Sequence, residues 1–235
     1  MNFFSLIFDQ GCLLCGHQDA FSEKYGLCCS CAFPLLFARK RGPLCSVCGR
    51  PLISEDGICM RCRSRDYSFD RNSYFWEYSD NAKAVVGFYK FKGYRRVGRF
   101  LALCLWRYLR HRYPDGVLLI PAPCSSGRLK KYGFNHITRI CRMLKRDFGI
   151  PFADVLHRRR GVQLKKLNRE QRKEEIRNKI YMNDRDASRM ADLCNGKSVV
   201  FLDDIFTTGA TASTCARVLR ESGIKDVDIV TFALD

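Results

Sequence analysis

One stretch of the chain, residues 199–213, constrains its fold more than any other. Four apolar residues lead into two adjacent acids, Asp203 and Asp204, and a turn of small residues follows: Thr207, Thr208, Gly209, Ala210 and Thr211. This pattern predicts a buried strand over residues 199–202, a loop, and a helix over residues 210–221. Backbone N–H groups exposed at the start of a helix favour a phosphate. We therefore expect a phosphate site at the end of this strand.

The order of the acids and the loop resembles the phosphoribosyl pyrophosphate (PRPP) signature of type I phosphoribosyltransferases. This resemblance implies that Asp203 and Asp204 take the two ribose hydroxyls, while the loop of residues 207–211 cradles the 5′-phosphate. PRPP would bind together with Mg²⁺.

The rest of the chain after residue 70 alternates between strand and helix patterns. Strands are predicted at residues 74–78, 117–120 and 227–234, and helices at residues 81–92, 97–113 and 134–148. Strand-helix units with short loops predict an α/β fold with a mostly parallel sheet flanked by helices. The resemblance of residues 199–213 implies that this fold is of the type I phosphoribosyltransferase kind.

A second candidate ligand loop follows the strand at residues 117–120. Ala122, Ser125 and Ser126 come next, and then the cations Arg128, Lys130 and Lys131. Open α/β sheets bind ligands at the carboxyl ends of their strands. The pyrophosphate of PRPP would therefore lie over residues 122–128, although the serines and Gly127 also fit a simple turn.

Nine of the 14 cysteines lie before residue 63. They form an internal repeat of four CxxC pairs: Cys12 with Cys15, Cys28 with Cys31, Cys45 with Cys48, and Cys59 with Cys62. Eight thiolates suit two structural zinc sites of four cysteines each. The spacing leaves open which pairs share a zinc ion, and whether Cys29 replaces Cys28.

We expect a double zinc ribbon module at residues 1–66 and the phosphoribosyltransferase-like domain at residues 70–235. The favoured role of the zinc ions is to stabilise a module whose hydrophobic core is too small to fold alone. Direct contact of the ribbons with nucleic acid is the secondary interpretation.

The chain is strongly basic, with a formal net charge of +17. Residues 128–179 hold 17 Lys or Arg against 5 Asp or Glu, which predicts an anionic partner, although basic helices are often only solvated faces. In the stretch YKFKGYRR at residues 89–96, the cations stand among aromatic residues, a mixture that suits stacked bases or an aromatic edge of the core. The candidate nucleic-acid contacts are Lys90, Lys92, Arg128, Lys130, Lys131, Arg139, Arg159, Lys165 and Lys166. Residues 158–179 are nearly all polar and predict a mobile arm or lid, followed by a helix.

No apolar run approaches the roughly 18 residues that a membrane-spanning helix needs. The start of the chain, MNFFSLIF, lacks a basic leader and a small-residue cleavage site. We expect a cytoplasmic protein without membrane insertion.

The combined motifs resemble the ComF family of competence proteins over essentially the whole chain. The resemblance rests on LIFDQGCLLCG, the CxxC pairs, YKFKG, IPAP, GFN, Gln163 with Arg172, and LDDIFTTGAT. Three positions depart from the family pattern. Tyr132 and His136 flank GFN where the family tends to have RGFNQ, and Glu175 stands where an asparagine is usual. The family implies handling of incoming single-stranded DNA beside a competence helicase.

Two functions remain open at this stage. One is a ComF-like DNA-uptake protein that binds PRPP and carries single-stranded DNA on its basic surface. The other is an active phosphoribosyltransferase that moves ribose 5-phosphate to an unidentified acceptor. For that reaction, Arg128, Arg158 and Arg172 are candidates to stabilise the departing pyrophosphate. No residue stands out as a nucleophile or general base.

Overall fold

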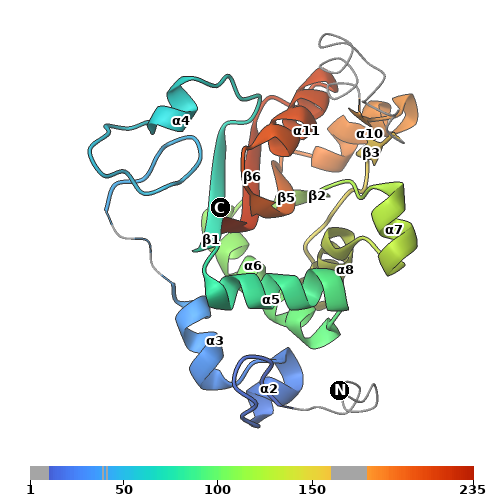
Figure 1. Ribbon diagram of the computed structural model, residues 1–235. Coiled ribbons are helices and arrows are strands. Elements are labelled where there is room, and N and C mark those ends of the chain that lie inside the picture. The colour runs from blue at the N-terminus through green and yellow to red at the C-terminus, as the bar shows by residue number, and fades with distance from the viewer. Residues whose placement is uncertain (1–10, 39, 41, 160–178) are drawn as a thin grey trace.

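A computed structural model describes residues 11–235 except 39, 41 and 160–178 (Figure 1). Its centre is a four-stranded sheet in the order β1-β6-β5-β2, and every neighbouring pair is parallel. The strands are β1 (Arg71–Glu77), β2 (Val117–Pro121), β5 (Ser198–Phe206) and β6 (Val227–Leu234). A separate antiparallel pair joins β3 (His157–Arg158) to β4 (Ile180–Tyr181). The predicted mostly parallel α/β fold is confirmed.

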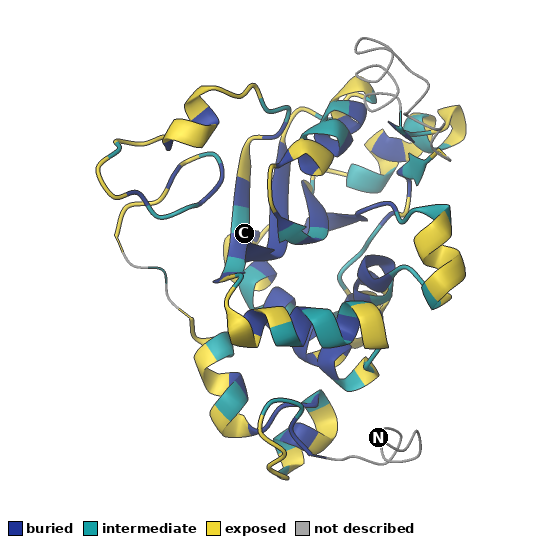
Figure 2. Cartoon of the chain, viewed as in Figure 1, coloured by how far each residue is buried: buried dark blue, intermediate teal, exposed yellow. Residues whose placement is uncertain are grey.

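Helices cover both faces of this sheet (Figure 1). On one face lies α11 (Ala210–Glu221), with α10 (Asp184–Cys194) beyond it. On the other face lie α5 (Asp80–Lys92), α6 (Arg95–Arg112) and α8 (His136–Phe148). All eight residues of β6 are buried, so the sheet lies in the core, as Figure 2 shows. Strands buried on both faces explain the near-continuous apolar runs of the sequence.

The helix boundaries follow from capping residues. Asn135 caps α8, because its side chain accepts hydrogen bonds from the N–H groups of Ile137 and Thr138. Gly93 ends α5 in the left-handed conformation that glycine adopts at no steric cost. The predicted helices agree with the observed ones to within two residues at each end.

Two local predictions were wrong. The strand predicted at residues 199–202 continues to Phe206, because Asp203, Ile205 and Phe206 still pair with β6. The acids therefore lie inside the strand and not after it. The candidate loop after β2 also becomes a short helix, α7 (Ser126–Tyr132), whose first turn is capped by the Ser125 side chain.

The cysteine-rich segment packs against the sheet domain at two separate places (Figure 1). In the first ribbon, α2 (Ala20–Tyr25) packs on α6, and α3 (Cys29–Leu36) accepts a hydrogen bond from the Trp76 indole at the Leu35 carbonyl. The second ribbon, with α4 (Met60–Arg63), lies beside β1, where the carbonyl of Val47 accepts the N–H of Asn72 at 2.7 Å. The division into residues 1–66 and 70–235 stays a prediction.

The other edge of the sheet is covered as well. The N–H of Leu119 in β2 donates to the Pro151 carbonyl, and the N–H of Ala153 donates to the Leu119 carbonyl. Among the residues that the structure describes, no helix is long and apolar enough to cross a membrane.

Candidate functional site

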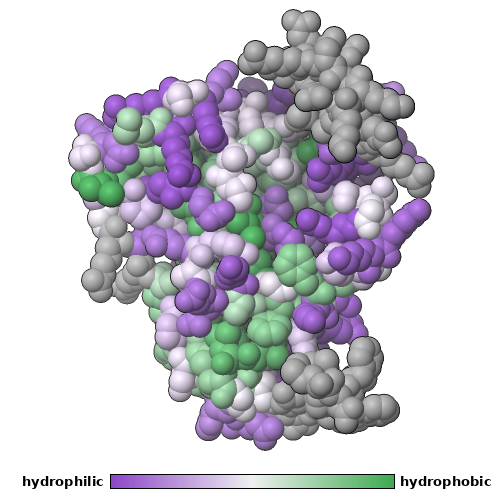
Figure 3. All heavy atoms as spheres, viewed as in Figure 1, coloured by the Kyte–Doolittle hydropathy of each residue, from purple (hydrophilic) through white to green (hydrophobic). Residues whose placement is uncertain are grey.

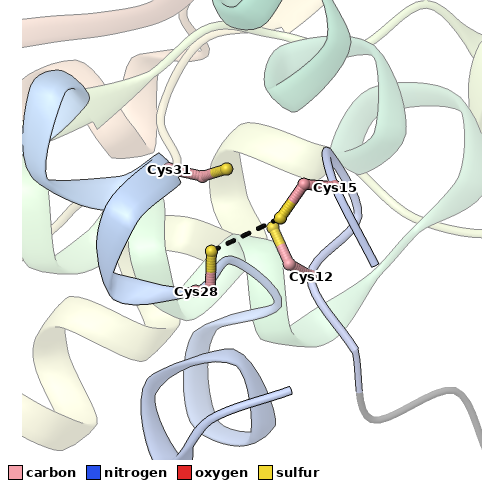
Figure 4. Close-up of side chains that lie close together, drawn as sticks. All are labelled: Cys12, Cys15, Cys28 and Cys31. Atoms are coloured by element: carbon pink, nitrogen blue, oxygen red, sulfur yellow. Dashed lines mark hydrogen bonds between the residues drawn. The ribbon is translucent and has the colours of Figure 1, made fainter. Parts of the chain in front are cut away.

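The first four-cysteine cluster is built by Cys12, Cys15, Cys28 and Cys31, whose sulfur atoms point toward one another (Figure 4). All four Sγ atoms lie within 4.8 Å of one another. Cys29 is exposed, and its N–H donates to the Asp19 carboxylate outside the cluster. Of the two candidates, Cys28 and not Cys29 therefore contributes its sulfur to the first cluster.

The second cluster consists of Cys45, Cys48, Cys59 and Cys62, again within 4.8 Å, so the CxxC pairs combine in chain order. The Cys48 and Cys59 sulfurs are 3.7 Å apart, near the roughly 3.8 Å expected for thiolates around one tetrahedral zinc ion. Burial raises the pKa of the Cys45 thiol, but N–H groups of Cys48, Cys59 and Val47 lower it to about 6. Four converging sulfurs with a stabilised thiolate fit structural zinc, and the two sites are consistent with two ions.

A small cavity lies at the carboxyl end of β5, where the predicted phosphate loop begins. Its volume is about 50 Å³, and its lining includes Asp203 and the loop residues Thr207, Thr208, Gly209, Ala210 and Thr211. Gly209 is the N-cap residue of α11 and supplies no side-chain cap. The first N–H groups of α11 therefore border a hollow of the kind that accepts an anion.

The two acids of β5 point to opposite faces of the sheet, because side chains alternate along a strand. Asp203 lines the cavity on the α11 side. Burial and the neighbouring Asp204 raise the pKa of Asp203 to about 7, partly offset by the charges of Lys90 and Arg128. The resemblance treated the acids as an equivalent pair, whereas their environments differ.

Asp204 lies on the other face, between α5 and α8. Its Oδ2 atom is 2.5 Å from the Lys90 Nζ and 2.8 Å from the His136 Nε2. His136 is held in place by Tyr89, whose hydroxyl donates to the His136 carbonyl. Burial acts to raise the pKa of Asp204, but the hydrogen bond with His136 and the charge of Lys90 hold it well below its usual range. Asp204 is therefore an ionised, immobilised carboxylate.

The second candidate ligand loop, at residues 122–128, lies next to the acids. Ala122 follows β2, and its N–H donates to the Leu202 carbonyl, one residue before Asp203. Ser125 and Ser126 begin α7, and Arg128 is exposed on it. Arg158 is half-buried at the end of β3, with its Nε atom buried. Burial raises the pKa of the Cys124 thiol in this loop, although the charges of Arg128 and Arg158 act to lower it.

The cations predicted to contact nucleic acid fall in different places. Lys92, Arg128, Lys130, Lys131 and Arg159 are exposed, whereas Lys90 is enclosed beside Asp204 and Arg139 is half-buried over the Phe134 ring. Figure 3 shows a hydrophilic surface over α7. Arg172, Lys165 and Lys166 lie outside the described residues.

Exposed apolar side chains stand among these cations. Phe91 at the end of α5 is 51% exposed and Leu129 on α7 is 47% exposed. The rings of Phe91 and Tyr132 lie 6.1 Å apart. We call Phe91, Lys92, Leu129, Lys130, Lys131 and Tyr132 the α5–α7 patch.

Sequence reasoning missed two features of the site. The first is the grouping of Lys90, Asp204 and His136, which come from three elements; His136 was marked only as a departure from the family pattern. The second is a set of contacts from the linker between the ribbons and the sheet, where Arg65 and Tyr67 donate hydrogen bonds to the Thr208 carbonyl of the predicted phosphate loop. No spacing in the sequence signals either one.

The chain is similar in sequence to known proteins, both in its cysteine-rich segment and over nearly its whole length. Residues 3–63 match the double zinc ribbon domain. Over 95% of its length, the chain is 27% identical to the competence protein ComFC of Bacillus subtilis, of which 93% is covered. The predicted resemblance to the ComF family is confirmed. Competence protein F of Haemophilus influenzae is 23% identical over 97% of each chain. The DNA utilization protein YhgH of Salmonella typhimurium is 27% identical over 93% of this chain and 94% of its own. The ComF resemblance thus spans both the ribbons and the α/β domain.

Proposed function

We propose that this chain is a competence or DNA-utilization protein whose α/β domain binds PRPP and whose basic surface carries single-stranded DNA. The names of its relatives support the DNA role. The observation that carries the PRPP site is the anion-accepting cavity at the start of α11, with an acid of β5 in its wall.

In this proposal PRPP lies across the carboxyl edge of β5. The N–H groups of residues 207–211 bind the 5′-phosphate, and a ribose over the strand end reaches Asp203 on one side and Asp204 on the other. The pyrophosphate lies toward Ala122, Ser125, Ser126 and Arg128. Mg²⁺, when bound, neutralises charge on the pyrophosphate oxygens. Lys90 and His136 keep Asp204 ionised and fixed in direction, so that it accepts a hydroxyl without reorganisation.

Titration calorimetry with PRPP and Mg²⁺ tests this site. We expect binding by the full chain and a loss of about tenfold or more in affinity for Asp203→Asn, because a buried acceptor for a hydroxyl is weakened. The exposed Asp115→Asn serves as the matched control. Absence of PRPP binding by the wild-type chain contradicts the proposal.

The DNA part of the proposal rests on the α5–α7 patch. Aromatic and apolar side chains that stack with bases, together with lysines that pair phosphates, are typical of sites that hold single strands without sequence preference. Lys130 and Lys131 are both exposed on α7. Phe91 extends the patch to the end of α5, the helix that also carries Lys90.

The salt dependence of oligonucleotide binding tests whether DNA binds at the α5–α7 patch or is attracted only by the overall positive charge of the chain. Oligonucleotide binding should weaken steeply with salt, and the double change Lys130→Glu with Lys131→Glu should reduce the slope of log K against log salt by about 1.4. The control double Lys83→Glu with Lys225→Glu, at two exposed positions, changes the net charge equally. It should reduce the affinity for the oligonucleotide less than the Lys130→Glu, Lys131→Glu double. Equal losses in the two doubles would show that the patch is not the site. PRPP binding should persist in both.

Phosphoribosyl transfer is the second candidate. It is supported by Arg128, whose charge acts to lower the pKa of Asp203 and which would lie beside the pyrophosphate in this proposal. In this reaction the bond between ribose C1 and a pyrophosphate oxygen breaks, and pyrophosphate leaves with both electrons. A new bond forms from C1 to a nitrogen of the acceptor, which releases its proton to the solvent. Arg128 and Arg158, and Arg172 outside the described residues, would stabilise that charge. Release of pyrophosphate in a screen of nucleobases and amines is the test, with Arg128→Gln as the impaired variant.

A further inference from the structure

The phosphate loop is held from behind by the linker that follows the second zinc ribbon. The carbonyl oxygen of Thr208 accepts two hydrogen bonds from this linker, one from Arg65 Nη1 at 2.6 Å and one from the Tyr67 hydroxyl at 3.0 Å. Arg65 also donates to the Tyr67 hydroxyl at 3.1 Å, which joins the three groups into one network. A further bond runs from the Ser68 N–H to the Ser213 hydroxyl in the first turn of α11.

These contacts determine which way the loop's donors point. In a trans peptide the carbonyl oxygen and the following N–H point in opposite directions. A Thr208 carbonyl drawn toward the linker therefore turns the Gly209 N–H away from it. Thr208 borders a cavity of about 440 Å³ on the linker side and also lines the small cavity next to Asp203.

Gly209 itself is enclosed by aromatic rings. Its φ is +74°, and a Cβ atom built there would lie 2.7 Å from Tyr67 and 2.7 Å from Phe206. Tyr67 stacks on Phe69 with ring centroids 4.7 Å apart, and Phe69 is buried against Phe206. The ring of Tyr67 thus limits rotation of the peptides that form the loop.

The same linker is anchored at both ends. On the ribbon side, the N–H of Arg65 donates to the carbonyl of Cys62, which is a cysteine of the second cluster. On the sheet side, Arg220 donates to the Ser68 carbonyl and pairs with Asp70, whose carboxylate accepts the N–H of Val227. Arg65, whose side chain holds the loop, comes only three positions after the cluster cysteine Cys62.

We propose that Arg65 and Tyr67 are positioning residues, which hold the loop of residues 207–211 in its phosphate-binding conformation and depend on the folded second ribbon for their own placement. This inference rests on the proposed function, since it assigns a role in the same phosphate site. The ribbon then contributes to ligand binding without touching the ligand.

Two probes that occupy different halves of the site test the proposal by titration calorimetry on the full chain. Ribose 5-phosphate engages the phosphate loop, whereas inorganic pyrophosphate with Mg²⁺ engages the loop at residues 122–128. We expect Arg65→Gln to weaken ribose 5-phosphate binding by about tenfold and to leave pyrophosphate binding within about twofold. Arg65→Lys keeps a donor and should restore part of the loss. Tyr67→Phe keeps the ring and should cost less than Arg65→Gln.

Arg61→Gln is the matched control, because Arg61 is an exposed arginine on α4 and its loss changes the charge equally. Equal weakening of both ligands by Arg65→Gln, or equal effects of Arg65→Gln and Arg61→Gln, would overturn the proposal.

Amide hydrogen exchange of the segment 206–214 supplies a readout that needs no ligand. Arg65→Gln should accelerate exchange there, and Arg61→Gln should not; unchanged exchange in Arg65→Gln contradicts the positioning role. If the wild-type chain binds neither probe, the proposed function fails, and this exchange comparison still decides the role of Arg65.

Discussion

Asp204 is the residue whose surroundings are most specific. Its carboxylate meets Lys90 and His136, and all three side chains are almost completely removed from solvent. A buried charge that loses its partner costs several kcal/mol, whereas an intact pair is close to neutral for stability. Removing one partner of Asp204 should therefore lower the stability of the fold by more than the intact contacts add to it.

Asp204→Asn should lower the free energy of unfolding by about 2 to 3 kcal/mol, because it leaves Lys90 charged and poorly paired in the interior. Urea unfolding of the zinc-loaded chain measures the change. The double variant Lys90→Met with Asp204→Asn should recover part of the loss, since both charges are then gone. Additive losses in this cycle would show that Lys90 and Asp204 do not interact.

The raised pKa of Asp203 makes the free energy of unfolding depend on pH. Its folded-state pKa is raised to about 7 from the usual 3.8, so between these values the folded chain keeps a proton that the unfolded chain releases. The free energy of unfolding must then fall as the pH rises from about 4 to about 7. Asp203→Asn should remove roughly 1 to 2 kcal/mol of this fall, allowing for solvent screening at the half-buried site. Parallel pH profiles for the variant and the wild type would contradict the raised pKa.

At the level of elements, the candidate phosphate loop and α11 depend on one glycine, Gly209. Gly209→Ala meets both a left-handed backbone and two rings, and it should destabilise the chain by about 2 to 4 kcal/mol. Gly223 also has a positive φ, of +94°, but a Cβ there meets nothing within 4 Å. Gly223→Ala is therefore the control for backbone strain alone, about 1 kcal/mol. Thermal unfolding of the two variants separates crowding from strain.

The ribbons give a prediction that metal analysis can check. Cys28→Ser should lower the zinc content from about two ions per chain to about one, because it removes a ligand from the first cluster. Cys29→Ser should leave about two ions, since Cys29 is exposed beside the cluster. A loss of zinc in Cys29→Ser would mean that the ligand assignment is reversed.

Sequence reasoning succeeded for features that are local along the chain. The helix at residues 210–221, the strand at residues 227–234 and the four CxxC pairs follow from periodicity and short spacing. Which pairs share a cluster was left open by the spacing and follows from the structure. The extension of β5 through the acids was missed because pairing with β6, and not local polarity, determines where a strand ends. Likewise, Lys90, His136 and Asp204 lie 46 to 114 positions apart, and only the folded chain brings them together.

At the scale of the whole molecule, the ribbons and the sheet share contacts that the division of the sequence into two parts does not show. Leu27 of the first ribbon and Asn72 of β1 are both buried, and Trp76 in β1 donates to a ribbon carbonyl. The first ribbon packs on a helix face, whereas the second adjoins a strand. Loss of either zinc ion should therefore disturb a different surface of the sheet domain.

The second ribbon lies beside β1, which is an edge strand of the sheet. Strands at the edge of a sheet are templates for pairing between molecules, and natural proteins cover them. Here the Val47 carbonyl and the Asn72 side chain, which donates to the Cys48 carbonyl, close part of that edge. A chain that loses its second zinc ion would open β1 to another chain. The second ribbon thus covers part of an edge strand that would otherwise be free to pair with another chain.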